Sequence, residues 1–187
     1  MDDVHDLIDR QTATWPDTAF REFTLDEART LAGAPLTFTT SVLGMEAISH
    51  VIEDHAAALG RPVEVFACFQ KLSNALAQRA RYEAILAAGS QVYFYGEPDW
   101  PAWDHPNLRV VPIRPGHPLA DVWLVALCDP RHVSMALLAR ELPDGAGRIR
   151  RQGDLIDRRF QGFKTYDGKL VSEMVEGLKL YAGAAHR

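Results

Sequence analysis

Residues 41–69 read SVLGMEAISHVIEDHAAALGRPVEVFACF and predict a helix followed directly by a buried strand. Over Ser41–Leu59, apolar side chains recur at steps of three and four residues, which is the spacing of one face of an α-helix. Gly60 and Pro62 end that helix because neither residue continues it well. The next run, Val63–Phe69, is short and nearly all apolar, which is typical of a strand buried on both faces. A helix leading into such a strand indicates an α/β domain.

The same alternation extends to both sides of this stretch. Thr24 and Glu27 form a capping box that opens a short helix, because each side chain bonds a free backbone N–H group of the other residue. Short runs of β-branched and aromatic residues predict further strands at residues 36–40, 91–95, 108–113, 122–128 and 158–166. Apolar residues at helical spacing predict helices at residues 133–142, 169–181 and 71–88, the last being one helix or two because residues 79–81 interrupt its face.

These elements predict a single α/β domain, with a mixed α+β arrangement as the alternative, in which helices pack on a central sheet of about five strands. Residues 1–34 are expected to form an N-terminal arm with the short capped helix, since Asp2–Thr14 is mostly polar and Trp15-Pro16 breaks any helix there. The domain proper then spans residues 35–183 and leaves 184–187 as a tail. Whether the later strands run parallel or antiparallel stays open, because they follow turns rather than helices.

The composition is that of an ordinary globular protein of 187 residues, with 47% hydrophobic and 24% charged residues. A net charge of −5 argues against a general nucleic-acid-binding protein, which normally has a basic excess, and gives no reason to expect a membrane partner. The acidic N-terminus lacks the features of a secretory signal, and no apolar run approaches the roughly 20 residues of a membrane-spanning helix. We therefore expect a cytoplasmic protein.

Motifs of common enzyme classes are missing from the sequence. The strand-to-helix turn at residues 68–73 has no glycine with which to cradle a phosphate, and no Gly-x-Ser-x-Gly sequence supplies a hydrolase nucleophile. Cys68 and Cys128 both lie in apolar runs, where cysteine acts as a small core residue rather than a reactive thiol or metal ligand. We expect no catalytic residues and no bound metal, and we leave any cofactor unassigned.

The densest cluster of potential metal ligands consists of His50, Glu53, Asp54 and His55. On a helix, His50 shares a face with Glu53 and Asp54, whereas His55 points about 140° away from His50 at roughly 100° per residue. One metal ion therefore does not readily take both imidazoles. We favour a solvated polar face with a His–Asp pair. The alternative is an enzyme that uses His50 and Asp54 as its titratable pair.

Arginines are concentrated around the loop that follows the strand at residues 122–128: Arg148, Arg150, Arg151, Arg158 and Arg159. One interpretation is a patch that binds an anion or a phosphate group. The other, which we favour in an acidic chain, is a solvated loop that neighbouring aspartates partly neutralise.

The aromatic residues are more informative, because Tyr95, Trp123 and Phe163 lie near strand ends, where α/β folds form ligand clefts.

Several segments, taken in order, resemble the DICT sensory domain of bacterial signalling proteins. The similar segments are AISHVIEDH (47–55), VFACFQ (65–70), RY (81–82), VYFYGEP (92–98), VVPI (110–113), VWLVA (122–126) and RRFQGFKT (158–165). The last is similar to the basic, aromatic Phe-x-Gly-Phe or Phe-x-Gly-Trp signature of the family. Order and spacing hold over about residues 35–183, and the ordered series rather than any single motif carries the resemblance.

The resemblance implies a sensory domain of the kind attached to diguanylate cyclases, histidine kinases or DNA-binding regulators, in a light or stress response. This sequence has no Gly-Gly-Asp-Glu-Phe cyclase motif, no kinase His box and no recognisable helix-turn-helix. We therefore expect a stand-alone sensory, ligand-binding domain that acts through such a partner protein. The residues that match recurrent family positions, and that we expect to bind the ligand, are Gln70, Tyr82, Trp123, Phe163, His50 and Arg81.

We expect the first four of these residues to line one pocket at a sheet edge. Gly96 and Gly162 also match the family. A close approach of backbone or ligand explains a glycine at these positions, and so does a turn or bulge.

Three hypotheses for the function remain, in order of preference. A sensor needs a pocket whose ligand distinguishes two states. An interaction module, which docks a partner or a second copy as a homodimer, needs an exposed apolar patch. An enzyme needs a titratable pair in a cleft.

Overall fold

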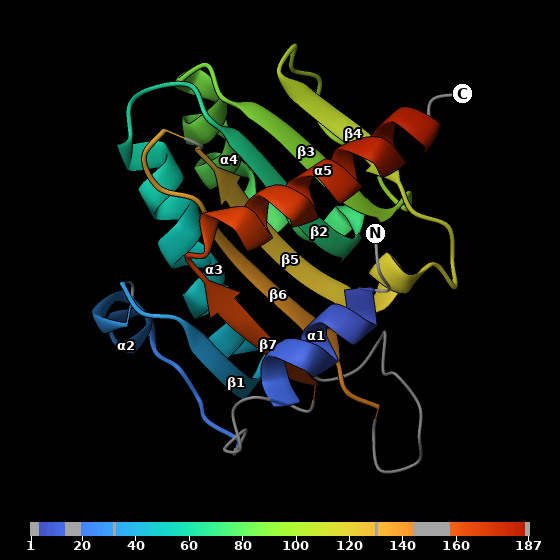
Figure 1. Cartoon of the computed structure of the whole chain (residues 1–187). Helices are drawn as coiled ribbons and strands as arrows, with labels where there is room; N and C mark the ends of the chain where they lie inside the picture. The colour runs from blue at the N-terminus through green and yellow to red at the C-terminus, as the bar shows by residue number, and fades with distance from the viewer. Residues whose placement is uncertain (1–3, 14–19, 32, 130, 144–157, 186–187) are drawn as a thin grey trace.

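Seven strands form one mixed sheet in the computed structural model, which describes residues 4–13, 20–31, 33–129, 131–143 and 158–185 (Figure 1). Strands β2, β3 and β4 run parallel, and every other neighbouring pair is antiparallel. The order across the sheet is β1 (Leu36–Ser41), β7 (Arg159–Thr165), β6 (Met135–Glu141), β5 (Val122–Cys128), β2 (Glu64–Lys71), β3 (Gln91–Glu97) and β4 (Leu108–Pro112). The prediction of about five strands was therefore too low, and the mixed arrangement is confirmed.

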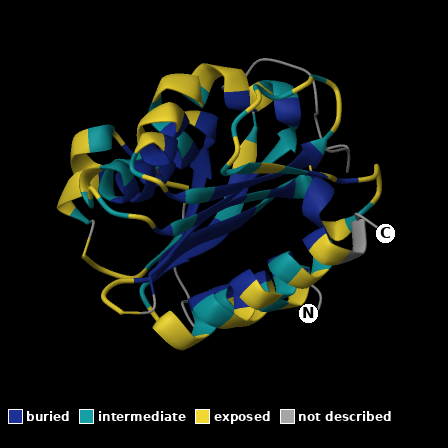
Figure 2. Ribbon diagram, turned by 90° about the horizontal axis from the view of Figure 1, so that it is seen from above, coloured by how far each residue is buried: buried dark blue, intermediate teal, exposed yellow. Residues whose placement is uncertain are grey.

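Helices cover both faces of this sheet, which lies between them as a layer of buried residues (Figure 2). One face packs against α2 (Leu25–Thr30), α3 (Val42–Ala58), the 3-10 helix η1 (Leu72–Gln78) and α4 (Arg79–Ala87). The other face packs against α1 (Val4–Ala13), the 3-10 helix η2 (Pro118–Asp121) and α5 (Gly168–Ala185).

Strand β2 shows why the central strands are apolar throughout. Val65 and Ala67 pack into the core beneath α3, whereas Phe66 and Cys68 pack into the core beneath α5. Successive side chains of a strand point to opposite faces, so a strand with helices on both sides needs an apolar residue at nearly every position. Cys68 and Cys128 are free and buried, which confirms their interpretation as core residues.

Local signals in the sequence place most helix ends correctly. Thr24 and Glu27 make both hydrogen bonds of the predicted capping box at the start of α2. The Ser41 hydroxyl accepts hydrogen bonds from the first backbone N–H groups of α3, and Gly60 follows this helix with a left-handed φ of 60°. The segment 71–88 divides at Arg79 into η1 and α4, as the interrupted apolar face allowed.

Two elements differ from the prediction. The segment 133–142, expected to be helical, forms strand β6. Its alanines and leucines favour helix locally, but β6 lies between β5 and β7 with both faces covered, and this tertiary burial outweighs the propensity. The N-terminal stretch contains α1, which buries Val4 and Ile8 against the sheet, so the arm prediction missed a helix. The boundaries proposed at residues 35 and 183 stay predictions.

Gly162 on β7 lies where the backbone of β6 leaves no room for a side chain. A Cβ atom built on it would lie 2.2 Å from the Leu138 carbonyl oxygen and 2.5 Å from the Ala139 Cα atom. Of the explanations offered for this glycine, close approach of the backbone is therefore confirmed. Gly96 is tight as well, because its Cβ would lie 3.1 Å from the Leu72 backbone nitrogen.

We expect Gly162→Ala to lower the free energy of unfolding by about 3 kcal/mol, because the strands must move apart to accept the methyl group. Gly183→Ala is the matched control, since nothing lies within 4 Å of its Cβ position in α5. The control should be neutral or stabilise by roughly 0.5–1 kcal/mol, as an exposed helical glycine allows. Urea unfolding of both variants measures these changes. Equal stability of the two variants would contradict the assignment.

Candidate ligand-binding site

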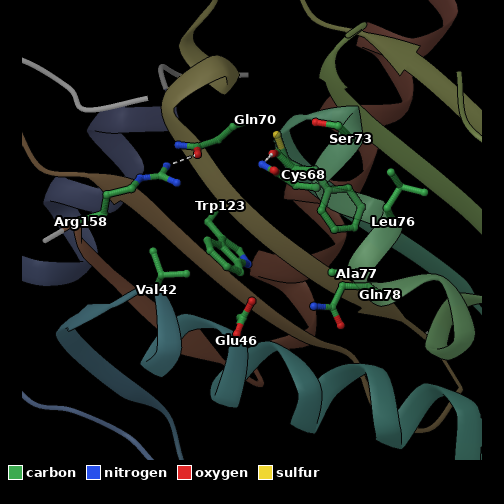
Figure 3. A pocket seen from close by; sticks show the side chains of 12 residues that line it. Val42, Glu46, Cys68, Gln70, Ser73, Leu76, Ala77, Gln78, Trp123 and Arg158 are labelled. Carbon is green, nitrogen blue, oxygen red and sulfur yellow. Dashed lines mark hydrogen bonds between the residues drawn. The ribbon is translucent and has the colours of Figure 1, made fainter. Parts of the chain in front are cut away.

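A pocket of about 330 Å³ opens between the first two turns of α3, the C-terminal end of β2, the start of β5 and η1 (Figure 3). Because β5 is antiparallel to β2, its first residues lie at the same end of the sheet as the last residues of β2. Apolar and polar side chains share the lining, which consists of Val42, Glu46, Cys68, Phe69, Gln70, Ser73, Asn74, Leu76, Ala77, Gln78, Trp123 and Arg158. Such a mixture is typical of small-molecule sites, where a few polar groups orient a mostly apolar ligand.

Trp123 forms the inner wall of this pocket and is fixed by two contacts. Its indole N–H donates a hydrogen bond to the Ser49 hydroxyl on α3, with 2.9 Å between nitrogen and oxygen. Its ring stands edge-on to Phe160 of β7, with ring centroids 5.4 Å apart. These contacts satisfy the one donor of the side chain and hold the ring in place, so the pocket wall is preorganised.

Gln70 has a strained backbone at the end of β2. Its φ is 58°, in the left-handed region that residues with a side chain rarely adopt, and the pairing of β2 with β3 is irregular between Cys68 and Lys71. The Gln70 amide donates a hydrogen bond to the Glu141 carboxylate at 3.0 Å and accepts one from the Arg158 guanidinium. Strain of this kind persists where surrounding contacts stabilise it, and it is concentrated at functional sites.

Glu141 and Arg158 form a buried ion pair beside the pocket. Two N–H groups of Arg158 donate to the two carboxylate oxygens of Glu141 at 2.8 and 2.7 Å, and the side chains are 1% and 10% exposed for Glu141 and Arg158, respectively. The prediction of a solvated arginine loop is therefore wrong for Arg158. Arg159 is exposed and lies over the Phe20 ring, and the other three arginines of that group lie outside the described residues.

The cluster on α3 contacts η1, α4 and α2, and the Asp54 side chain stays 41% exposed. His50 shares a hydrogen bond with the Gln78 amide oxygen at 3.0 Å, and Asp54 pairs with Arg81 and Arg29, so the predicted His–Asp pair does not form. Burial, followed by the positive charge of Arg81, lowers the pKa of His50. In the described part of the chain, no three His, Cys, Asp or Glu side chains are grouped to hold a metal ion.

Glu53 is buried, which corrects the prediction of a solvated face at this position. Its carboxylate accepts a hydrogen bond from the Tyr82 hydroxyl at 2.7 Å and lies 3.2 Å from the Arg81 Nε atom. Loss of hydration on burial outweighs both partners and raises the pKa of Glu53 from 4.5 to about 7. The same burial, with the neighbouring carboxylate, raises the pKa of Tyr82 well above its ordinary value, so Tyr82 stays a hydrogen-bond donor.

The structure brings only some of the six predicted ligand-binding residues together. Gln70 and Trp123 line the pocket, whereas His50, Arg81 and Tyr82 form a second layer between α3 and α4. Phe163 packs on the opposite face of the sheet, in the core under α5. The pocket also lies over β2 and β5, in the middle of the strand order, and not at a sheet edge.

Sequence reasoning missed the lining residues on α3 and η1. Val42 and Glu46 belong to a helical pattern in which they look like ordinary core and surface positions. A second hollow, of about 500 Å³, lies at the other end of β5 and is lined in part by Asp129, His132 and Tyr166. Asp129 already pairs there with Arg61, so the pocket at Trp123 is the stronger candidate.

A family model described as the sensory domain in diguanylate cyclases and two-component systems, DICT, matches residues 23–142. The match covers most of the chain, and the chain belongs to the DICT family. No curated protein and no solved structure shows a significant match. Among the helices in the described ranges, none is long and apolar enough to cross a membrane.

We expect Glu53→Gln to change how stability depends on pH. Because the folded-state pKa is raised from 4.5 to about 7, protonated Glu53 stabilises the fold at low pH, and this contribution is lost as pH rises through that window. The wild type should therefore lose up to about 3 kcal/mol relative to the variant between pH 4.5 and 8. Urea unfolding at a series of pH values measures the difference.

Glu83→Gln is the matched control, because Glu83 is a half-exposed glutamate on α4 that pairs with Arg79. It should leave the pH profile of the free energy of unfolding unchanged. A constant offset between wild type and Glu53→Gln, with no dependence on pH, would show that burial does not raise the pKa of Glu53.

Proposed function

We propose that this chain is a sensory, ligand-binding domain of bacterial signal transduction that binds a small molecule in the pocket at Trp123. Membership of a family of sensory domains supports the sensory part of the proposal. The observation that carries the binding part is the pocket itself, which has a fixed aromatic wall and contains several polar side chains. Its volume of about 330 Å³ is at the lower end of the range for small-molecule sites.

The contacts around the pocket suggest how binding is passed on. Gln70 touches the ligand space and also bonds to Glu141 and Arg158, which join β2 to β6 and to the start of β7. Gln78 lines the pocket and bonds to His50 on α3. A ligand that binds better to one arrangement of these bonds shifts the population toward that arrangement. Its effect then reaches the sheet through Gln70 and α3 through Gln78.

In this proposal the domain binds and does not catalyse, and its output is read by a signalling protein. Two pairs of titratable groups beside the pocket are engaged with each other, Glu141 with Arg158 and Glu53 with Arg81. The family occurs in diguanylate cyclases and two-component systems, so a cyclase, a kinase or a transcription regulator in the cytoplasm is the partner that we infer. A light or stress signal fits the same setting.

A second candidate function is a protein–protein interaction module, as an adaptor or a homodimer. Two exposed leucines support it. Leu43 on α3 is 57% exposed, and Leu76, which lines the pocket on η1, is 44% exposed. Exposed apolar side chains beside one another favour docking when they form a continuous patch.

Native mass spectrometry of the protein purified from bacterial cells distinguishes the two candidates. The sensor proposal expects an extra mass of small-molecule size that is lost on denaturation. Trp123→Ala should lose that mass, because it removes the pocket wall, while Leu180→Ala on the exposed side of α5 should keep it. A ligand-free dimer in both variants would instead support the interaction module.

A further inference from the structure

Glu46 is the acidic residue of the pocket, and its carboxylate faces the ligand space. It lies one turn into α3, and Figure 3 shows its side chain extending toward Trp123. No hydrogen bond or ion pair joins it to another residue in the described ranges of the chain, and its charge acts on His50 and Glu53 through space. A carboxylate that lines a half-apolar pocket in this way has acceptor capacity to offer to a bound molecule.

The other charged groups near the pocket are balanced among themselves. Arg158, the cationic residue of the lining, is bonded to Glu141 through both carboxylate oxygens. Arg81 pairs with Glu53 and Asp54 in the layer behind Gln78. Burial, followed by the positive charge of Arg81, lowers the pKa of His50, against the opposing effects of Gln78 and Glu46, and so favours the neutral imidazole. Glu46 is therefore the charged residue of the lining that has no ion-pair partner among the described residues, and its carboxylate attracts cations and repels anions.

Trp123 offers a second attraction of the same sign. The face of an indole ring carries a negative electrostatic potential and attracts a cation within about 6 Å of its centre. Trp123 is held edge-on to Phe160 and tethered to Ser49, so the ring is a fixed part of the wall. A carboxylate and a fixed indole on one pocket are the combination that recognises organic ammonium groups.

We propose that the ligand is a small organic amine whose ammonium group pairs with Glu46 near Trp123 and whose apolar body packs against Val42, Phe69 and Leu76. This inference rests on the proposed sensory function and adds the chemical class of the ligand. A carboxylate or phosphate ligand would have to displace Gln70 or Glu141 from Arg158 to find a cationic partner in the lining. An amine finds Glu46 without breaking a bond between residues that the structure describes.

Isothermal titration calorimetry with three probes that share an indolylethyl group tests the charge preference directly. The probes are tryptamine, the uncharged alcohol tryptophol and the anion indole-3-propionate. We expect tryptamine to bind at least tenfold more tightly than either of the others, since a charge-assisted hydrogen bond adds more than a neutral one. Tryptophol reports on the apolar pocket alone, because it keeps the indole and lacks the charge.

Glu46→Gln should remove the preference for tryptamine, with a loss of roughly tenfold or more in its affinity and little change for tryptophol. Glu173→Gln is the control, because Glu173 is an exposed glutamate on α5, across the sheet from the pocket. Circular dichroism checks that both variants fold. The control should bind all three probes as the wild type does.

The outcomes separate this inference from the sensory proposal. If tryptophol or indole-3-propionate binds as tightly as tryptamine, and Trp123→Ala abolishes that binding, the pocket is a ligand site and the amine assignment is wrong. An unchanged tryptamine affinity in Glu46→Gln also overturns the assignment. Failure of all three probes to bind overturns it as well, and the native mass spectrum then decides on its own whether the sensory proposal stands.

Discussion

The buried ion pair between Glu141 and Arg158 is the contact on which the candidate site depends. It joins the end of β6 to the residue before β7, and Gln70 links both to the end of β2. Removing one partner of such a pair leaves an uncompensated charge in the interior, at a cost of about 3–5 kcal/mol. It would also release Gln70 from its left-handed backbone conformation. The shape of this end of the pocket is therefore tied to the integrity of the pair.

The two covered faces of the sheet explain why the pocket lies where it does. Side chains from β2 and β5 alternate between a core under α3 and a core under α5. The α3 side also carries polar residues at helical spacing, from Glu46 through Ser49 and His50 to Glu53. Ser49, His50 and Glu53 each find a partner on β5, η1 or α4. Glu46 comes first along the helix, where the pocket opens, and so its side chain lines the pocket.

Periodicity in the sequence was enough to predict the helix at residues 41–59 and the strands that border it, because their burial patterns are strong and local. It failed at β6, where alanine and leucine favour a helix and only the neighbouring strands decide otherwise. For the site, family resemblance identified Gln70 and Trp123. The prediction was wrong for Phe163. Phe160 lies on the face of the sheet that carries the pocket, and an odd spacing of three residues along β7 puts Phe163 on the opposite face. Glu46 gave no signal, since an acidic residue on an amphipathic helix is ordinary.

The sensor and interaction hypotheses share one exposed residue, Leu76. Leu76 lines the pocket and is also an exposed apolar residue of the protein. Leu43, the other exposed leucine, follows the lining residue Val42 in the first turn of α3. A ligand whose apolar body packs on Leu76 removes part of the surface that a protein partner would otherwise cover. Ligand binding and partner docking at this face would compete if the ligand covers the surface that the partner needs. They would reinforce each other if the bound ligand adds to that surface. If the partner docks at this face, the effect of ligand binding does not have to be transmitted through the rest of the domain to reach it.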